Sequence, residues 1–153
     1  MKVVIGADHA GYGLKEEIKE VLRQLSIEFL DVGTMNSEAS VDYPDFAEAV
    51  ARKVASGEFD RGIIVCGTGV GVAIAANKVK GIRAANCNDV VCAKFSREHN
   101  DANILTMGSR IIGPAVANEI VKTWLGTEFE GGRHARRVEK ISQLEERERS
   151  GVK

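Results

Sequence analysis

The sequence predicts an α/β fold, a three-layer sandwich in which helices cover both faces of a parallel sheet. Short apolar runs rich in β-branched residues alternate along the chain with segments that carry the helical period. The runs are almost continuously apolar, which is typical of parallel strands buried on both faces. The 153 residues suffice for a sizeable core, so we expect a single domain over residues 1–153.

The first half of the chain is expected to contain two strands and two helices. Residues 2–7 read as a first strand, and residues 12–25 carry their apolar side chains at the spacing of a helix that packs on a sheet. Residues 28–32 read as a second strand, and residues 33–42 form a polar connection. Pro44 suits the first turn of the next helix, which closes at a Ser-Gly pair.

The second half continues the alternation. Residues 63–66 form a third strand, which leads through a glycine-rich loop into an alanine-rich helix. Residues 82–86 and 104–107 are expected to be the fourth and fifth strands, with a helix over about residues 89–97 between them. A Gly-Pro pair opens a further helix over residues 113–126. Strands that alternate with helices in this way indicate a parallel sheet.

The end of the chain predicts a helix of a different kind, over about residues 134–149. Its apolar residues are Val138, Ile141 and Leu144, three apart in a background of glutamate and arginine. So narrow a stripe could pack on the chain's own domain or on a partner subunit. We expect it to pack on a partner subunit.

Composition excludes several classes of protein. A hydrophobic content of 44%, a charged content of 28% and a net charge of -1 are those of an ordinary soluble protein, with no indication of nucleic acid or membrane partners. Nothing resembles a secretion signal or a membrane span, so we expect a cytoplasmic protein. The three cysteines lack a Cys-x-x-Cys pair, which argues against a disulfide framework or a zinc site. Cys87 and Cys92 are expected to be structural.

The glycine loop, residues 67–71, is the most informative motif. It places three glycines at alternate positions between the strand that ends at Cys66 and the following helix. Glycines let backbone N–H groups approach an anion, and the N-terminus of a helix adds partial positive charge. A thiol at this junction is placed to be held as a reactive thiolate, which could serve as a nucleophile or a general base. The alternative is an inert cysteine at the end of a buried strand.

The glycine loop has two other possible interpretations, and Cys66 has one. In a dinucleotide fingerprint the third glycine would come one residue later and the loop would follow the first strand. A phosphate-binding P-loop would end in Gly-Lys-Ser/Thr, which is not the sequence here. A Cys-His hydrolase would pair Cys66 with a histidine, and His99-Asn100 makes that pairing conceivable.

Polar residues follow several of the predicted strands. Asp8-His9, the glycine loop, residues 86–88 and residues 107–110 all stand at strand ends, so a parallel sheet would gather them at one edge. Asp8-His9 could instead be a turn with local capping.

Two further groups could carry chemistry or merely face solvent. His99 could cap a helix C-terminus or exchange protons near neutral pH. Arg133 and Arg137 are four residues apart, a spacing that puts two guanidinium groups on one helix face and suits a phosphate, whereas Arg136 could simply be solvated.

Several motifs together resemble the type B ribose-5-phosphate isomerase family, and they follow its order over essentially the whole chain. The motifs are Gly6-Ala7-Asp8-His9-Ala10-Gly11, Asp42-Tyr43-Pro44, Cys66-Gly67-Thr68-Gly69-Val70-Gly71, Arg97-Glu98-His99-Asn100-Asp101-Ala102-Asn103, Gly108-Ser109-Arg110 and Glu130-Gly131-Gly132-Arg133-His134.

The resemblance implies a Rossmann-like α/β/α sandwich with a five-stranded parallel sheet. It implies interconversion of D-ribose 5-phosphate and D-ribulose 5-phosphate through a cis-enediol, in the pentose phosphate pathway and without a metal or organic cofactor. It also implies a homodimer or a tetramer whose active sites are shared between subunits.

The resemblance assigns a role to each matched residue. Cys66 would move the proton between C1 and C2 with the help of Thr68, while His99, helped by Asp8, would open the furanose ring. The other matched residues would bind substrate: Gly67, Gly69, Val70, Gly71 and Asn100 at the enediolate, Tyr43 along the pocket, and His9, Arg110, Arg133 and Arg137 at the phosphate.

Alternatives within and beyond the family stay open. Some branches use a glutamate base, but position 75 is Ala75, which places this chain with the cysteine-type branch. Allose 6-phosphate and galactose 6-phosphate isomerases look similar and are the rival enzymes. A nucleotide-binding module and a non-catalytic sugar-phosphate sensor are the rivals from other classes.

Overall fold

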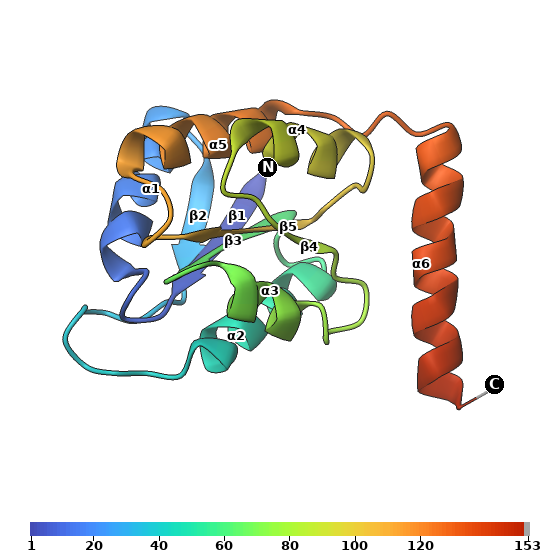
Figure 1. Ribbon diagram of the computed structural model, residues 1–153, viewed down its shortest axis with the longest axis horizontal. Helices are drawn as coiled ribbons and strands as arrows, with labels where there is room; N and C mark the ends of the chain where they lie inside the picture. The colour runs from blue at the N-terminus through green and yellow to red at the C-terminus, as the bar shows by residue number, and fades with distance from the viewer. Residues whose placement is uncertain (152–153) are drawn as a thin grey trace.

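The computed structural model describes residues 1–151 and shows a five-stranded parallel sheet between two helical layers (Figure 1). The elements in chain order are β1 (Lys2–Ala7), α1 (Tyr12–Gln24), β2 (Glu28–Asp31), α2 (Tyr43–Ala55), β3 (Arg61–Cys66), α3 (Val70–Ala76), β4 (Ala84–Asn86), α4 (Val90–Glu98), β5 (Ile104–Gly108), α5 (Pro114–Gly126) and α6 (Arg133–Ser150).

The sheet has the strand order β2-β1-β3-β5-β4, and every pair is parallel. Helices α1, α4 and α5 cover one face, where Ile18, Leu105 and Trp124 belong to one core cluster. Helices α2 and α3 cover the other face around Val50, Ile64 and their neighbours. The three-layer fold expected from the alternating patterns is therefore confirmed.

The fourth strand is shorter than the sequence predicts. Only Ala84–Asn86 belong to β4, although residues 82–86 carry a strand-like pattern. The Ile82 N–H donates to the carbonyl of Val79 at 3.2 Å and so closes a turn. The Arg83 N–H donates to the side-chain oxygen of Asn103 at 2.8 Å. The Arg83 bond takes the N–H that would otherwise pair with β5, and the turn bond holds Ile82 out of the strand.

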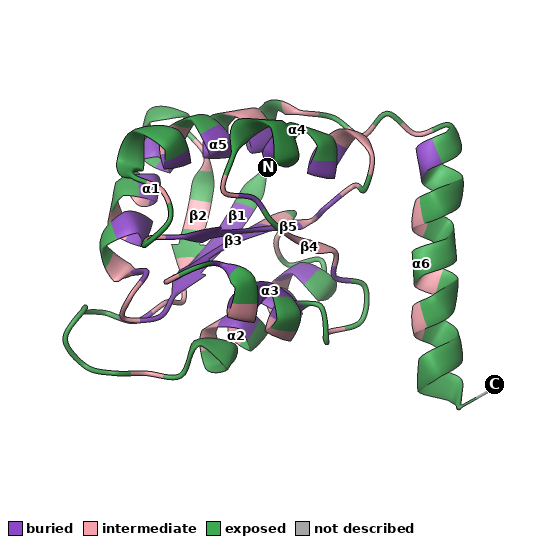
Figure 2. Cartoon of the chain, in the orientation of Figure 1, coloured by how far each residue is buried: buried purple, intermediate pink, exposed green. Residues whose placement is uncertain are grey.

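Helix α6 stands apart from the sandwich (Figure 1). Within the described chain it buries one of its own residues, His134, and Figure 2 shows most of the helix exposed. Polar contacts tie it to the turn before β4: the Gly81 N–H donates to Glu145 at 3.0 Å, and Lys80 pairs with Glu146. Ile141 and Leu144 remain about half exposed, at 50% and 51%.

None of the helices in the described residues combines the length and the apolar character that a bilayer crossing demands.

Candidate active site

The register of the central strands brings three predicted groups to one edge. Ala7 lies opposite Val65, and Cys66 lies opposite Gly108. The residues that follow β1, β3 and β5 therefore emerge side by side at the carboxyl edge of the sheet. The order β2-β1-β3 also makes β1 and β3 the pair from which the chain winds outward in both directions, a position where α/β sheets bind ligands.

Cys66 ends β3 with its side chain turned into the glycine loop. The residue is 5% exposed, and its Sγ accepts the Gly69 N–H at 3.1 Å. Such a hydrogen bond stabilises negative charge on sulfur. Thr68 is exposed beside it, and its hydroxyl oxygen accepts the Val70 N–H at 3.2 Å. The Thr68 hydroxyl donates to no other group among the described residues, so its proton is available for donation to a bound molecule.

Neighbouring elements fix the shape of the glycine loop. Gly69 adopts φ +82°, and a Cβ there would come within 2.4 Å of the Asn86 side chain. The Tyr43 ring packs against Gly71, where a Cβ would lie 2.7 Å from it, and the Arg110 guanidinium covers Gly67. The loop is therefore built for close approach of the backbone, with an aromatic ring and a cation over it.

Two polar residues that the sequence does not single out hold this loop from the side. Thr106 donates its hydroxyl to the carbonyl of Gly69 at 2.8 Å. Asn88 donates to the carbonyl of Thr68 at 3.2 Å and accepts the Gly108 N–H at 2.8 Å. Asn88 lies in a stretch flagged only for its position at a strand end, and Thr106 reads as an ordinary strand residue.

Asp8 and His9 lie across from Cys66, at the end of β1. Asp8 is 6% exposed, and its carboxylate accepts the Gly11 N–H at 2.9 Å, the local cap that was the alternative interpretation. The Nδ1 of His9 accepts the Val41 N–H at 3.2 Å. This bond assigns the proton of the neutral ring to Nε2 and ties the connection between β2 and α2 to the site.

The other predicted residues lie at the opposite edge of the sheet. Helix α4 runs back from the carboxyl end of β4 (Figure 1). His99 and Asn100 directly follow its last residue, Glu98, so they lie near the amino ends of the strands. Arg83, which precedes β4, donates to the carbonyl of Asn100 at 3.1 Å, and the Glu130 N–H donates to the carbonyl of Glu98 at 3.1 Å. At about 3.3 Å per residue, the two edges are roughly 15–20 Å apart along β3. One chain therefore does not bring His99 to Cys66.

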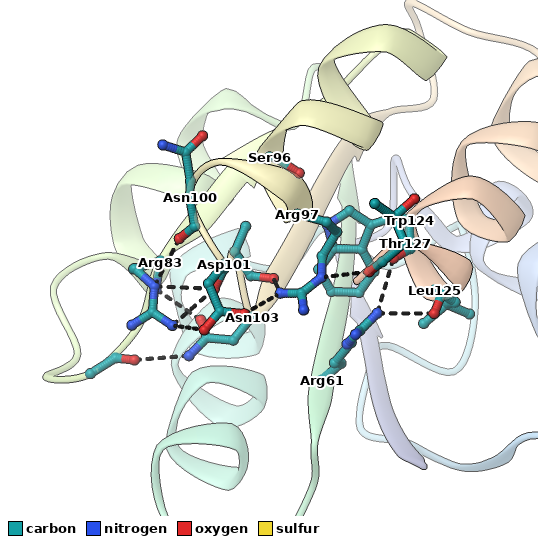
Figure 3. A network of polar contacts seen from close by, with 12 residues as sticks. Arg61, Arg83, Ser96, Arg97, Asn100, Asp101, Asn103, Trp124, Leu125 and Thr127 are labelled. Atoms are coloured by element: carbon teal, nitrogen blue, oxygen red, sulfur yellow. Dashed lines mark hydrogen bonds and ion pairs between the residues drawn. The ribbon is translucent and has the colours of Figure 1, made fainter. Parts of the chain in front are cut away.

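Two arginines clamp the turn that carries His99 and Asn100 (Figure 3). Arg97, 5% exposed, bonds the Asp101 carboxylate at 2.9 Å and the carbonyl of Ala102 at 2.6 Å. Arg83 reaches the other Asp101 oxygen at 3.2 Å. Asp101 itself adopts φ +45°, a left-handed conformation that aspartate tolerates better than most residues. The clamp holds a strained turn in place.

The same network extends to the single tryptophan. The guanidinium carbons of Arg61 and Arg97 lie 5.3 and 5.9 Å from the Trp124 ring centroid. Arg61 also donates to the carbonyls of Trp124 and Leu125 at the end of α5, at 2.9 and 3.1 Å (Figure 3).

The start of α6 brings two more predicted residues to the amino edge. Arg133 and Arg137 are both exposed in the first turns of α6, one helical turn apart as predicted. Arg136 is exposed between them.

His99, Glu130 and His134 form a group whose ligand-type atoms lie within 4.8 Å of one another. The two imidazole rings are stacked with an interplanar angle of 11° and centroids 4.2 Å apart. Imidazole lone pairs lie in the ring plane, so nearly parallel rings direct them along parallel planes rather than toward one ion. The arrangement suits ring stacking rather than a metal centre.

The known proteins that this chain is similar to are sugar-phosphate isomerases. The ribose/galactose isomerase family model matches residues 3–141. Ribose-5-phosphate isomerase B of Escherichia coli is 51% identical over 95% of this chain and 97% of its own length. A protein of Pectobacterium atrosepticum named D-erythrulose-4-phosphate isomerase is 42% identical over 97% of this chain and 98% of its own length. The solved structure of Clostridium thermocellum ribose-5-phosphate isomerase B superposes with a TM-score of 0.94 at 57% identity, covering 96% of this chain and 99% of the other.

Proposed function

Because the chain belongs to the ribose/galactose isomerase family, we propose that it interconverts D-ribose 5-phosphate and D-ribulose 5-phosphate. The observation that carries the proposal is the environment of Cys66. Its sulfur accepts a backbone N–H at the entrance of a glycine loop, with an exposed hydroxyl and an exposed guanidinium beside it. An aldose–ketose isomerase needs a base that can return its proton, donors for a developing oxyanion and a cation for the phosphate.

The first step of the proposed reaction opens the furanose ring. His99 takes the proton from the hydroxyl on C1 and delivers it to the ring oxygen, so that the C1–O bond to the ring breaks and C1 becomes an aldehyde. The proposal gives Asp8 a supporting part in this exchange.

The second step moves a proton between the two carbons. The Cys66 thiolate removes the proton from C2, and the electron pair forms a C1–C2 double bond while O1 becomes an oxyanion. The resulting thiol returns a proton to C1, and the proton on O2 passes to the O1 oxyanion, which leaves a hydroxyl on C1 and a ketone at C2. Thr68 would assist the transfers between O1 and O2, and the loop N–H groups and Asn100 would stabilise the enediolate. Gly69 and Val70 already donate to Cys66 and Thr68, which leaves this role to the other members.

The phosphate would be bound by groups from both edges of the sheet. His9 and Arg110 lie at the Cys66 edge, where Tyr43 lines the loop, and Arg133 and Arg137 lie on α6. Such an anchor contributes binding energy that positions the reacting carbons.

The split between the edges leads us to propose that a second copy of the chain completes each site, as a homodimer. His99, Asn100, Arg133 and Arg137 of one copy would face Cys66 of the other. Helix α6 supports this proposal, because it leaves a groove of about 730 Å³ toward the body whose lining includes Ile82, Ile141 and Leu144. Exposed apolar side chains of this kind suit a self-complementary contact.

A four-carbon substrate is the second candidate. Relatives named D-erythrulose-4-phosphate isomerase share 42% and 48% identity with this chain. A four-carbon aldose phosphate lacks the hydroxyl needed to close a furanose ring. It would therefore need the proton transfer by Cys66 but no ring opening. Comparing kcat/KM for the two aldose phosphates decides between them.

The test is formation of ribulose 5-phosphate from ribose 5-phosphate in EDTA, for the parent and for Cys66→Ala. We expect the parent to be active in the chelator, and the variant to lose about 10²- to 10⁴-fold in kcat with little change in KM. Cys92→Ala is the matched control, because Cys92 is an exposed cysteine on α4. Equal turnover by Cys66→Ala and the parent would exclude the thiolate mechanism, and an inactive parent would exclude the substrate.

A further inference from the structure

The imidazole of His99 is packed between two other rings. Phe95 stacks on it with centroids 4.7 Å apart and an interplanar angle of 12°, and His134 stacks on it at 4.2 Å and 11°. Phe95 and His99 are one helical turn apart at the end of α4, whereas His134 comes from the first turn of α6. The three-ring stack therefore joins two helices that are far apart in the sequence.

His134 is the fixed member of this stack. It is 6% exposed, against 43% for Phe95. Its backbone N–H donates to the carbonyl of Gly131 at 3.0 Å, and its Nε2 lies 3.4 Å from the Glu130 carboxylate. Burial, followed by the charges of His99 and Arg133, lowers the pKa of His134 below its ordinary value, while Glu130 acts in the other direction. A neutral ring next to His99 lets His99 gain a proton without a second positive charge in contact.

We propose that His134 is a positioning residue that holds the ring plane of His99 for opening the sugar ring. The inference rests on the proposed function, since it assigns a partner to the histidine that would exchange protons with the substrate. His134 itself touches no reacting atom in this proposal.

The geometry explains why a stacked partner is useful. The two nitrogens of an imidazole exchange protons along directions in the ring plane. Contact on both faces fixes that plane and leaves the edge of the ring open toward a bound sugar. Without His134, one face loses its contact and the His99 side chain gains rotational freedom about its side-chain torsions. A misplacement of about 1 Å costs on the order of 100-fold in rate.

The chemistry of the two sugars separates a positioning defect from general damage. Ribose 5-phosphate exists mainly as a closed furanose and must be opened. Ribulose 5-phosphate has its C5 oxygen blocked by phosphate, so it cannot form a five-membered ring and stays open. Removal of its C1 proton by Cys66 therefore needs no ring opening, and exchange of that proton with solvent deuterium reports the second step alone.

The experiment compares His134→Ala and His134→Phe with the parent in two assays. The first measures kcat for ribose 5-phosphate, and the second measures deuterium entry at C1 of ribulose 5-phosphate. We expect His134→Ala to lose about 10- to 100-fold in the first assay and to stay within about threefold of the parent in the second. His134→Phe restores a flat ring and is expected to recover most of the first activity. Lys140→Ala, exposed on the same helix, is the matched control.

Each result bears on the proposal. Equal losses in both assays would overturn the positioning role and show a structural defect instead, which thermal midpoints and oligomeric state measured alongside would identify. An unchanged kcat in His134→Ala, or a His134→Phe variant as poor as His134→Ala, would overturn the positioning role. An inactive parent would instead remove the proposed function itself, so the two failures are distinguishable.

Discussion

Lys15 places a charged group in the interior of the molecule. Its side chain is 1% exposed, and its ammonium bonds the Asp31 carboxylate at 2.6 Å and the carbonyl of Thr34 at 2.9 Å. Lys19 reaches the same Asp31 oxygen at 2.8 Å. Burial by itself raises the pKa of Asp31, but the hydrogen bonds from the two lysines outweigh it and hold that pKa below its ordinary value. The ion pair of Lys15 with Asp31 fixes the start of the connection between β2 and α2. The same connection contains Val41, whose N–H bonds His9.

This carboxylate predicts an acid-sensitive contribution to stability. Unfolded Asp31 binds a proton more readily than native Asp31, so its contribution is complete above the ordinary pKa of 3.8 and is lost as pH falls through the lower native value. Asp31→Asn should cost about 3 kcal/mol at pH 7, because it leaves the buried Lys15 with only the part-exposed Glu16, 3.4 Å away, as a counter-charge. The variant should also lose less stability than the parent between pH 5 and pH 3, to be checked by urea unfolding.

The exposed pair Arg52–Glu48 provides the control for that measurement. It joins two solvated side chains at 2.7 Å, so Glu48→Gln should change stability by less than about 1 kcal/mol. A comparable cost for the two substitutions would contradict the interpretation of Asp31.

At the scale of elements, the glycine loop and the turn before β4 offer a direct comparison. Gly69 has φ +82° and would place a Cβ 2.4 Å from Asn86 and 2.8 Å from the backbone of Met107. Gly81 has nearly the same φ, +81°, and open space around its Cβ position. The two positions share the conformational cost and differ in the clash.

Gly81→Ala should therefore destabilise the protein by about 1 kcal/mol, the cost of a left-handed alanine. Gly69→Ala adds overpacking to that cost and should reach about 3–4 kcal/mol. It should also lower isomerase activity strongly, because relieving the clash would displace the backbone N–H that bonds Cys66. Denaturant unfolding and steady-state rates check both effects, and equal costs at the two sites would show that the clash relaxes.

The elements also show what a sequence can and cannot predict. Continuous apolar runs identify β1, β3 and β5, because strands buried on both faces leave a strong signal. Residues 82–86 mislead, because a local turn bond holds Ile82 out of the strand and the Asn103 side chain, from a distant part of the sequence, takes the N–H of Arg83. The pattern likewise stops short of Arg61 and Gly62, which join β3 because β1 pairs with both and β5 also pairs with Gly62.

The candidate site could likewise be predicted from the sequence only in part. The gathering of Asp8, Cys66 and Arg110 at one edge follows from strand order and could be predicted. The separation of His99 from Cys66 is not visible in the spacing of the residues, but it follows from the parallel sheet, because a helix between two parallel strands must run back to the amino edge. The three-ring stack could not be predicted from the sequence, because His134 and Phe95 are 39 positions apart and meet only through the placement of α6.

At the scale of the whole molecule, a site completed by a second copy predicts complementation. Cys66→Ala and His99→Ala homodimers should each be nearly inactive for ribose 5-phosphate. After the two are mixed and allowed to exchange subunits, half of the dimers are hybrids, and each hybrid has one site with both Cys66 and His99 intact. Activity should then rise to about a quarter of the parent's value.

The control for this experiment mixes two variants from the same edge. Cys66 and Asp8 lie side by side at the same edge of one copy. Each copy in a hybrid of Cys66→Ala and Asp8→Ala would therefore have a damaged Cys66 edge, and no complete site would form. Recovery in that mixture, or none in the Cys66–His99 mixture, would contradict the shared site. Size-exclusion chromatography of the parent measures the oligomeric state independently.

Trp124 makes the amino edge of the molecule optically visible. It is the single tryptophan of the chain, fully buried, with the guanidinium groups of Arg61 and Arg97 over its ring. Because Arg97 also hydrogen-bonds the turn that carries His99, the intrinsic fluorescence of Trp124 reports on that turn without any attached dye. Emission maximum and quenching by iodide can therefore follow the loosening of the Asp101 clamp and global unfolding on one unmodified protein.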